Sequence, residues 1–100
     1  MRVVSQKLRD SARGQCCTLR IPGVCNFNSE TTVLAHLPCG HKGAGMKSPD
    51  MMAVFCCYAC HAYIDGENRW RVSAYDYLRA LAETQMVWVS TGLMTIKGMK

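Results

Sequence analysis

The sequence lacks any apolar run long enough to form a secretory signal peptide or a membrane-spanning helix. It also lacks internal repeats and low-complexity segments, so its 100 residues are expected to form one small domain. Without export, disulfide bonds are not expected, and the seven cysteines need another explanation. Clustered cysteines in a cytosolic chain point to a bound metal, which is a common supplement to a small core.

Acidic residues are scarce in the first half of the chain. Up to Lys47, seven lysines and arginines stand against Asp10 and Glu30, a balance of +5 that equals the net charge of the whole chain. A basic half on a small domain fits a polyanionic partner such as DNA. Ordinary solubilising surface charge explains the same imbalance equally well.

Two pairs of cysteines have the spacing of a zinc site. Two thiols three positions apart can grip one metal from a tight turn that runs into a helix, and the turn signal Pro22-Gly23 folds a second pair back beside them. The predicted structural zinc ligands are Cys17, Cys25, Cys57 and Cys60. Each of these could instead be a small buried apolar residue. The adjacent Cys16 and Cys56 cannot easily ligate as well and are expected to pack.

The middle of the chain has the order strand, loop, strand, helix. A β-branched and apolar run over 31–37 predicts a strand with His36 at its end, and 51–55 predicts a second buried strand. A helix is expected to follow from Cys57. With zinc ligands on both sides, this is the shape of a ββα-metal unit. The predicted fold is therefore a small zinc-stabilised α+β domain with a core over about 14–66.

Two further segments flank this core. Residues 5–13 form either a short basic helix or a frayed N-terminal segment, and a linker is expected over 66–72. Apolar residues at mostly three- and four-residue spacing predict an additional C-terminal helix over about 73–90. Trp70 and Trp88 are both expected to pack rather than to stack on bases. The predicted core face of the C-terminal helix consists of Tyr77, Leu78, Leu81, Ala82, Gln85 and Trp88.

The run Cys57-Tyr58-Ala59-Cys60-His61, preceded by the strand end Ala35-His36, resembles the zinc-containing branch of the HNH (His-Me finger) endonucleases. The resemblance implies that two cysteine pairs bind a structural Zn²⁺, that His36 is the general base and that His61 ligates a catalytic Mg²⁺ or Mn²⁺. Asp65 lies four residues after His61, on the same helical face, and is a second candidate ligand. His41, in a glycine-rich basic loop over 38–45, is a further candidate for binding the metal or a phosphate.

Most of the chain, roughly residues 8 to 92, resembles the YbcO family of small prophage-encoded proteins classed as nucleases. The matching segments are Arg13-Gly14, Arg20-Ile21-Pro22-Gly23-Val24-Cys25-Asn26, Leu34-Ala35-His36, Pro49-Asp50 and Ala59-Cys60-His61. Two positions depart from the usual HNH pattern. Ala35 stands where many of these enzymes carry a metal ligand. Met51 and Met52 lie in the region of the expected central asparagine, where only Asp50 could substitute for it.

The sequence therefore predicts a metal-dependent endonuclease that hydrolyses phosphodiester bonds in duplex or branched DNA, in phage DNA processing or recombination. Its expected setting is the cytoplasm of a bacterial host, and a homodimer would suit cleavage of both strands. The proposed active-site residues are His36, His61 and Asp65. The alternative is a catalytically inactive, zinc-stabilised module that binds nucleic acid or protein.

Overall fold

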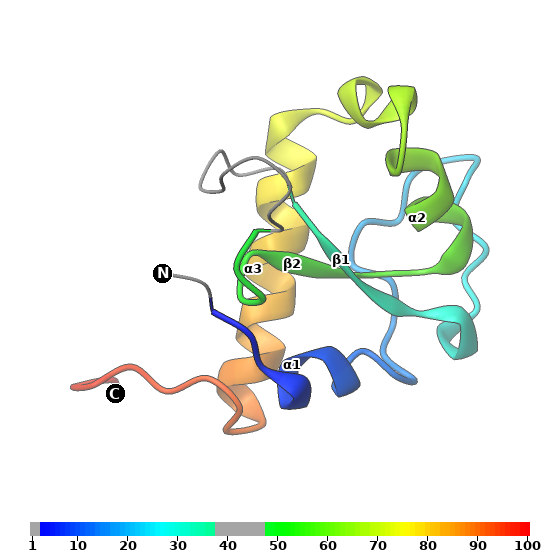
Figure 1. The fold of residues 1–100 in the computed structure, drawn as a ribbon. Helices are drawn as coiled ribbons and strands as arrows, with labels where there is room; N and C mark the ends of the chain where they lie inside the picture. The colour runs from blue at the N-terminus through cyan, green and yellow to red at the C-terminus, as the bar shows by residue number, and fades with distance from the viewer. Residues whose placement is uncertain (1–2, 38–47) are drawn as a thin grey trace.

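A computed structural model of the chain describes residues 3–37 and 48–100 (Figure 1). It is a small α+β fold in which α3 runs across the back of a two-stranded sheet and α2 follows directly from the second strand. No helix within these two ranges is long and apolar enough to cross a membrane. The elements in chain order are α1 (Gln6–Asp10), the 3-10 helix η1 (Ser29–Thr31), β1 (Val33–His36), β2 (Ala53–Cys56), α2 (Tyr58–Ile64), the 3-10 helix η2 (Glu67–Arg71) and α3 (Ala74–Ser90).

The sheet confirms the predicted order of strand, strand and helix. β1 and β2 pair antiparallel with His36 opposite Ala53, so His36 is the last residue of its strand. The strand expected over 31–37 is shorter because its start forms η1, whose first turn is capped by the side chain of Asn28. The predicted glycine-rich loop over 38–45, with His41 and Cys39, lies outside the described residues.

Both faces of β2 are buried, and alternate residues enter two different clusters. Val54 and Cys56 pack in the cluster that contains the paired cysteines. Phe55 instead packs edge-on against Trp88, with ring centroids 5.8 Å apart. Trp88 is fully buried, and its indole N–H donates to the hydroxyl of Ser11. The prediction that Trp88 packs is confirmed.

The N-terminal segment forms a helix, shorter than the expected 5–13. The side chain of Ser5 caps α1 by accepting from the backbone N–H of Leu8. The chain then continues in turns to Gly14, whose φ of +76° suits a residue without a side chain. In Figure 1, α1 lies beside the C-terminal half of α3, where Leu8 and Ala12 pack with the Phe55 cluster.

The long helix α3 begins after Ser73, whose hydroxyl accepts from the backbone N–H of Asp76, and it ends before Gly92. These bounds agree with the helix expected over 73–90. Its predicted core face was wrong at Leu78, which is 64% exposed, and at Ala82, which is exposed as well. Leu78 follows Tyr77 by about 100° around the helix, which turns it away from the sheet. The buried residues of α3 are Ala80, Leu81, Thr84 and Trp88.

The segment expected as a linker is ordered as η2. The hydroxyl of Tyr77 on α3 donates to the backbone carbonyl of Arg69, at 2.7 Å, and so ties η2 to the long helix. The prediction that Trp70 packs was wrong, because its side chain is 75% exposed. The prediction followed the general preference, since a tryptophan is more often buried.

Candidate functional site: a thiol cluster beside a histidine-lined cleft

The four cysteines predicted as zinc ligands converge on one point. Their sulfur atoms all lie within 4.8 Å of one another, and the sulfurs of Cys25 and Cys57 are 3.8 Å apart. Tetrahedral zinc with Zn–S bonds of about 2.3 Å places its sulfur ligands about 3.8 Å apart, so the donor set fits this ion. Within the described residues, this is the one group of three or more metal-binding side chains. The cluster could hold a metal such as zinc.

Each cysteine pair is shaped by a tight turn with an N–H group aimed at sulfur. The sulfur of Cys57 caps α2 by accepting from the backbone N–H of Cys60. In the same way the sulfur of Cys17 accepts from the backbone N–H of Arg20, at 3.3 Å. These two hydrogen bonds hold the sulfurs of Cys17 and Cys57 on the inner side of their turns.

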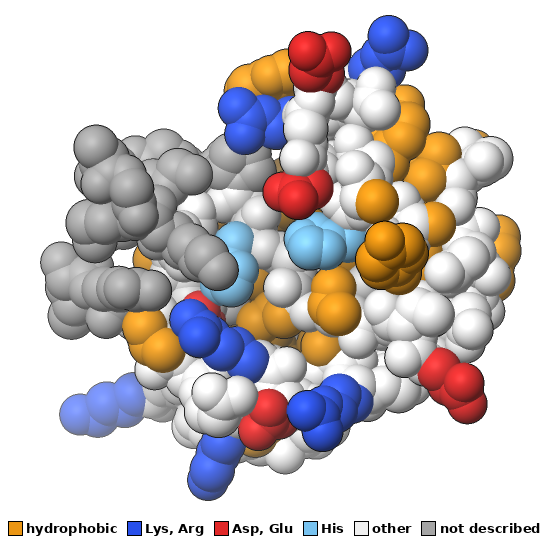
Figure 2. All heavy atoms as spheres, turned by 45° about the vertical axis from the view of Figure 1, so that its right-hand side comes forward, with side chains coloured by type: hydrophobic (Ala, Val, Ile, Leu, Met, Phe, Trp, Pro, Cys, Tyr) orange, Lys and Arg blue, Asp and Glu red, His pale blue; other side chains and the backbone are white. Residues whose placement is uncertain are grey.

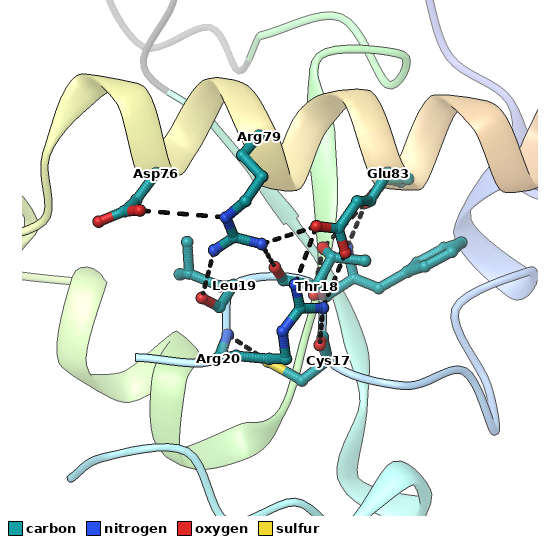
Figure 3. Close-up of polar contacts among 9 residues, drawn as sticks. Cys17, Thr18, Leu19, Arg20, Asp76, Arg79 and Glu83 are labelled. Atoms are coloured by element: carbon teal, nitrogen blue, oxygen red, sulfur yellow. Dashed lines mark hydrogen bonds and ion pairs between the residues drawn. The ribbon is translucent and has the colours of Figure 1, made fainter. Parts of the chain in front are cut away.

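An ion-pair network fastens the first of these turns to α3 (Figure 3). The guanidinium of Arg20 makes two hydrogen bonds to the carboxylate of Glu83, at 2.7 and 2.8 Å. Arg79 also reaches Glu83 and donates to the backbone carbonyls of Thr18 and Leu19. Arg20 has a φ of +46°, which is unusual for a residue with a side chain. Its hydrogen bonds to Glu83, together with those from Arg79 to the preceding carbonyls, stabilise this conformation.

The two spare cysteines have different outcomes. Cys56 is fully buried, as expected, whereas Cys16 is exposed and its predicted packing was wrong. Cys56 donates a hydrogen bond to Cys17, which lowers the pKa of Cys17 to about 4 and raises the pKa of Cys56. Burial raises the pKa of Cys60. A bound divalent cation offsets the cost of gathering thiolates in a buried cluster.

A cleft with a volume of about 950 Å³ opens beside the thiol cluster. Figure 2 shows this face, where two histidine side chains lie close together with acidic and basic side chains around them. His36 enters from the end of β1 and His61 from the first turns of α2, so the ββα arrangement brings both to one place. Six of the residues that line the cleft matter for the chemistry of the site: Arg9, His36, His61, Asp65, Arg69 and Trp70.

His36 is held by a buried carboxylate. Its Nε2 lies 2.8 Å from Oδ1 of Asp50, whose side chain is almost wholly buried. Asp50 also accepts from the backbone N–H of Ser5, at 2.6 Å, and from the guanidinium of Arg9, at 2.9 and 3.3 Å. Burial alone raises the pKa of this carboxyl, but the hydrogen bonds from Ser5, His36 and Arg9 outweigh it and bring the pKa to about 2.

The charge on Asp50 decides which nitrogen of His36 carries the proton. A carboxylate can only accept hydrogen bonds, so Nε2 of His36 is the donor, and in the neutral ring Nδ1 then has the lone pair. A histidine in this state is ready to accept a proton. The sequence suggested that only Asp50 could substitute for a missing asparagine, and in the structure the Asp50 carboxylate is hydrogen-bonded to His36.

His61 and Asp65 both line the cleft, and neither joins the thiol cluster. α2 ends at Ile64, and Asp65 is its C-terminal cap, with its backbone N–H bonded to the carbonyl of His61. In residues 3–37 and 48–100 they do not form a group of three metal-binding side chains. Ala35, in the position of a frequent third ligand, is buried at 2% exposure and turns away from solvent.

Sequence reasoning missed the contribution of the N-terminal helix and of η2. Arg9 lies 41 residues from Asp50 in the chain, and its basic character alone suggested only phosphate contacts. The hydrogen bond from the backbone N–H of Ser5 to Asp50 has no signal in the sequence. Trp70 had a signal, because it stands between two arginines, but the pattern favoured packing.

Comparisons with known proteins agree on one family. The family model described as "Putative nuclease YbcO" matches residues 6–93. A protein of Escherichia coli (strain K12) named "Putative nuclease YbcO" is 44% identical over 91 residues, which cover 87% of this chain and 95% of that protein. A protein of Enterobacteria phage 82, "Putative nuclease ybcO", matches with the same identity and coverage. A solved structure, "Structure of a putative bacteriophage protein from Escherichia coli str. K-12 substr. MG1655", matches with a TM-score of 0.66 and 37% identity, over 86% of this chain and 100% of that chain.

Proposed function

The chain belongs to the YbcO family, and on this basis we propose that it is a metal-dependent endonuclease of the HNH type that hydrolyses phosphodiester bonds in DNA. The names of its relatives indicate a nuclease in general. The observation that carries the finer proposal is the cleft, where His36, already held by Asp50, meets His61 and Asp65. The phage relative supports a role in phage or prophage DNA processing within the cytoplasm of the bacterial host.

His36 is the proposed general base. Its Nδ1 accepts a proton from a water molecule, and the oxygen of that water attacks the phosphorus in line with the leaving oxygen. This proton transfer converts His36 to an imidazolium. The carboxylate of Asp50, which is hydrogen-bonded to Nε2, stabilises the new positive charge. Asp50 is thus a positioning residue that keeps the ring in one orientation and one tautomer.

His61 and Asp65 are the residues that would hold a divalent ion such as Mg²⁺ or Mn²⁺. When bound, this ion would polarise the scissile phosphate and stabilise the charge on the leaving oxygen. Two protein ligands suit Mg²⁺, which usually keeps several waters and takes one or two carboxylates plus substrate phosphate. Arg9 and Arg69, on the rim of the same cleft, can contact the phosphates on either side.

The four cysteines are proposed to hold a structural Zn²⁺ that fixes the first turn of α2. Cys57 is the N-cap of that helix, and His61 follows Cys60 directly. Clamping the two sulfurs therefore fixes the start of the helix that presents His61 to the cleft. Four thiolates would complete the coordination of such an ion and leave it no open position for the substrate.

A second candidate function is a zinc-stabilised module that binds nucleic acid or protein without cleaving. The observation that favours it is Ala35, which cannot ligate a metal, together with the lack of a third ligand beside His61 and Asp65 in the described part of the chain. Under this reading the cleft binds a ligand and His36 has only a structural role.

A plasmid-nicking assay on zinc-loaded protein separates the two functions. We expect nicking only with added Mg²⁺ or Mn²⁺, and we expect His36→Ala, purified in parallel, to abolish it while DNA binding stays within about twofold. Equal zinc content and circular dichroism of the two proteins would exclude unfolding as the cause. Absence of metal-dependent nicking by the folded protein, on plasmid and on branched DNA, would favour the binding module. Nicking by His36→Ala at the wild-type rate would exclude His36 as the general base.

A further inference from the structure

The two tryptophans of this chain have opposite environments. Trp88 is fully buried, and its N–H group is bonded to Ser11. Trp70 is 75% exposed and lines the cleft that also contains His36 and His61. Single exposed apolar side chains are common, but an indole on the wall of a polar cleft offers a large flat surface to whatever enters it.

The indole of Trp70 is held at the cleft by its neighbour Arg69, which is itself anchored to α3. The guanidinium of Arg69 lies 4.7 Å from the ring centroid, in a cation–π contact. The backbone of Arg69 is in turn fixed by the hydroxyl of Tyr77 on α3, at 2.7 Å. Because η2 is anchored in this way, the ring is presented by an ordered element rather than by a free loop, which lowers the entropy cost of binding a ligand to it.

The charges around Trp70 favour a phosphate-bearing ligand. Arg69 and Arg71 flank it in the sequence and are both exposed, and Arg9 lies on the wall of the same cleft. Two acidic residues, Asp65 and Glu67, also line the cleft. Under the proposed function Asp65 faces a divalent cation, which leaves the arginines to balance Glu67 and the phosphates. An aromatic ring beside arginines is the usual arrangement for a base with its adjoining phosphate.

We propose that Trp70 stacks on an unpaired nucleobase next to the scissile phosphate, so that the preferred substrate carries single-stranded nucleotides at the cleft. In a continuous duplex both faces of every base are covered by neighbouring bases, and an indole can stack only on a base that is unpaired or at an end. The class of substrate is therefore single-stranded, flapped or branched DNA rather than intact duplex. This inference rests on the proposed function, because it takes the cleft as the nuclease site.

Binding of two DNA probes to the zinc-loaded full chain, without added Mg²⁺ or Mn²⁺, tests the proposal. The probes are a 12-nucleotide single strand and a relaxed, covalently closed circular duplex, which has neither unpaired bases nor ends. We expect the single strand to quench tryptophan fluorescence and Trp70→Ala to weaken its binding about tenfold or more, since stacking of one base accounts for a loss of that size. Duplex binding should stay within about twofold.

Two further variants keep the test specific. Trp70→Tyr retains an aromatic face and should recover most of the single-strand affinity. Tyr75→Ala removes another exposed aromatic residue, on α3 and outside the cleft, and should change neither affinity. In Trp70→Ala the one remaining tryptophan is the buried Trp88, so its emission reports directly whether the variant is folded.

The outcomes separate this inference from the proposed function. Equal losses for both probes, or no loss for either, would overturn the stacking role; the latter result would instead fit an apolar side chain of a protein partner as the occupant. If His36-dependent nicking is present and Trp70→Ala binds the single strand normally, the nuclease stands and the stacking proposal falls. If Trp70→Ala loses single-strand binding but no protein form nicks DNA, the stacking site stands without the nuclease.

Discussion

Replacing Asp50 with asparagine tests whether this buried carboxylate positions His36. Asparagine has nearly the same volume and can still accept hydrogen bonds, so Asp50→Asn removes the charge without opening a cavity. The side chain is 1% exposed, and its four hydrogen bonds come from Ser5, Arg9 and His36. An amide in its place has one acceptor oxygen instead of two, and its NH₂ group would face Arg9 or His36.

The size of the stability effect follows from the pKa. In the folded protein the pKa of Asp50 is about 2, below its ordinary value of 3.8. A lowered pKa means that the ionised carboxyl stabilises the fold, with its full contribution above the unfolded pKa and a loss as the pH falls through about 2. At pH 7 the contribution is about 2 kcal/mol. Asp50→Asn should lower the free energy of unfolding by about that amount.

The expected effect on catalysis is larger. A general base contributes about 10²–10⁴-fold to the rate, and a ring that can flip or change tautomer loses much of that. We expect Asp50→Asn to reduce the rate of metal-dependent nicking at least tenfold while DNA affinity stays within about twofold, because the buried carboxylate does not face the substrate.

Glu83→Gln is the matched control. The hydrogen bond from Arg20 lowers the pKa of Glu83 to about 2 as well, but its side chain is 38% exposed. Solvent screens such a pair, so its loss should cost under about 1 kcal/mol and leave nicking unchanged. Urea unfolding at pH 7 and the plasmid assay measure both quantities. Nicking by Asp50→Asn at the wild-type rate, or a stability loss no larger than that of Glu83→Gln, would refute the positioning role.

Two further perturbations concern the fold itself. Cys60→Ser should lose zinc and unfold the domain, because structural zinc contributes about 10 kcal/mol or more. The control Cys16→Ser should retain one zinc per chain and stay folded. Zinc analysis and circular dichroism measure both properties, and a folded, zinc-free Cys60→Ser would contradict the site. Thr84→Val should cost about 2 kcal/mol in urea unfolding, because the buried hydroxyl accepts from the N–H of Phe55, at 3.2 Å, and bonds the hydroxyl of Thr18, at 3.0 Å. An unchanged midpoint for Thr84→Val would show that these partners find other hydrogen bonds.

The features that the sequence predicted well depend on short-range patterns. The spacing of Cys57 and Cys60 defines a turn by itself, and the strand that ends in His36 is a run of β-branched and apolar residues. The cap at Ser73 and the stop at Gly92 bound α3 for the same reason. The convergence of the four cysteines was predicted from their chemistry, because four thiols in a small domain have few arrangements other than around one ion.

The features that the sequence did not predict depend on which sides of distant elements meet. Leu78 has the spacing of a core residue, yet the face of α3 that meets the sheet lies one residue earlier, at Tyr77. Cys16 and Cys56 are both spare members of a doublet, and only the packing around β2 decides that one is buried and the other exposed. The Arg9–Asp50 pair joins residues 41 positions apart, a contact that no local pattern encodes.

The thiol cluster and the cleft are physically coupled, because both are built on α2. Cys57 and Cys60 set the first turn of this helix, and His61 is the next residue. Any change that releases a metal from the cluster therefore also releases His61, whichever function the cleft performs. His36 is held differently, through Asp50 to α1 and the residue that caps it. Loss of the cluster therefore acts on His61 directly, through the start of its helix, and on His36 only through unfolding of the domain.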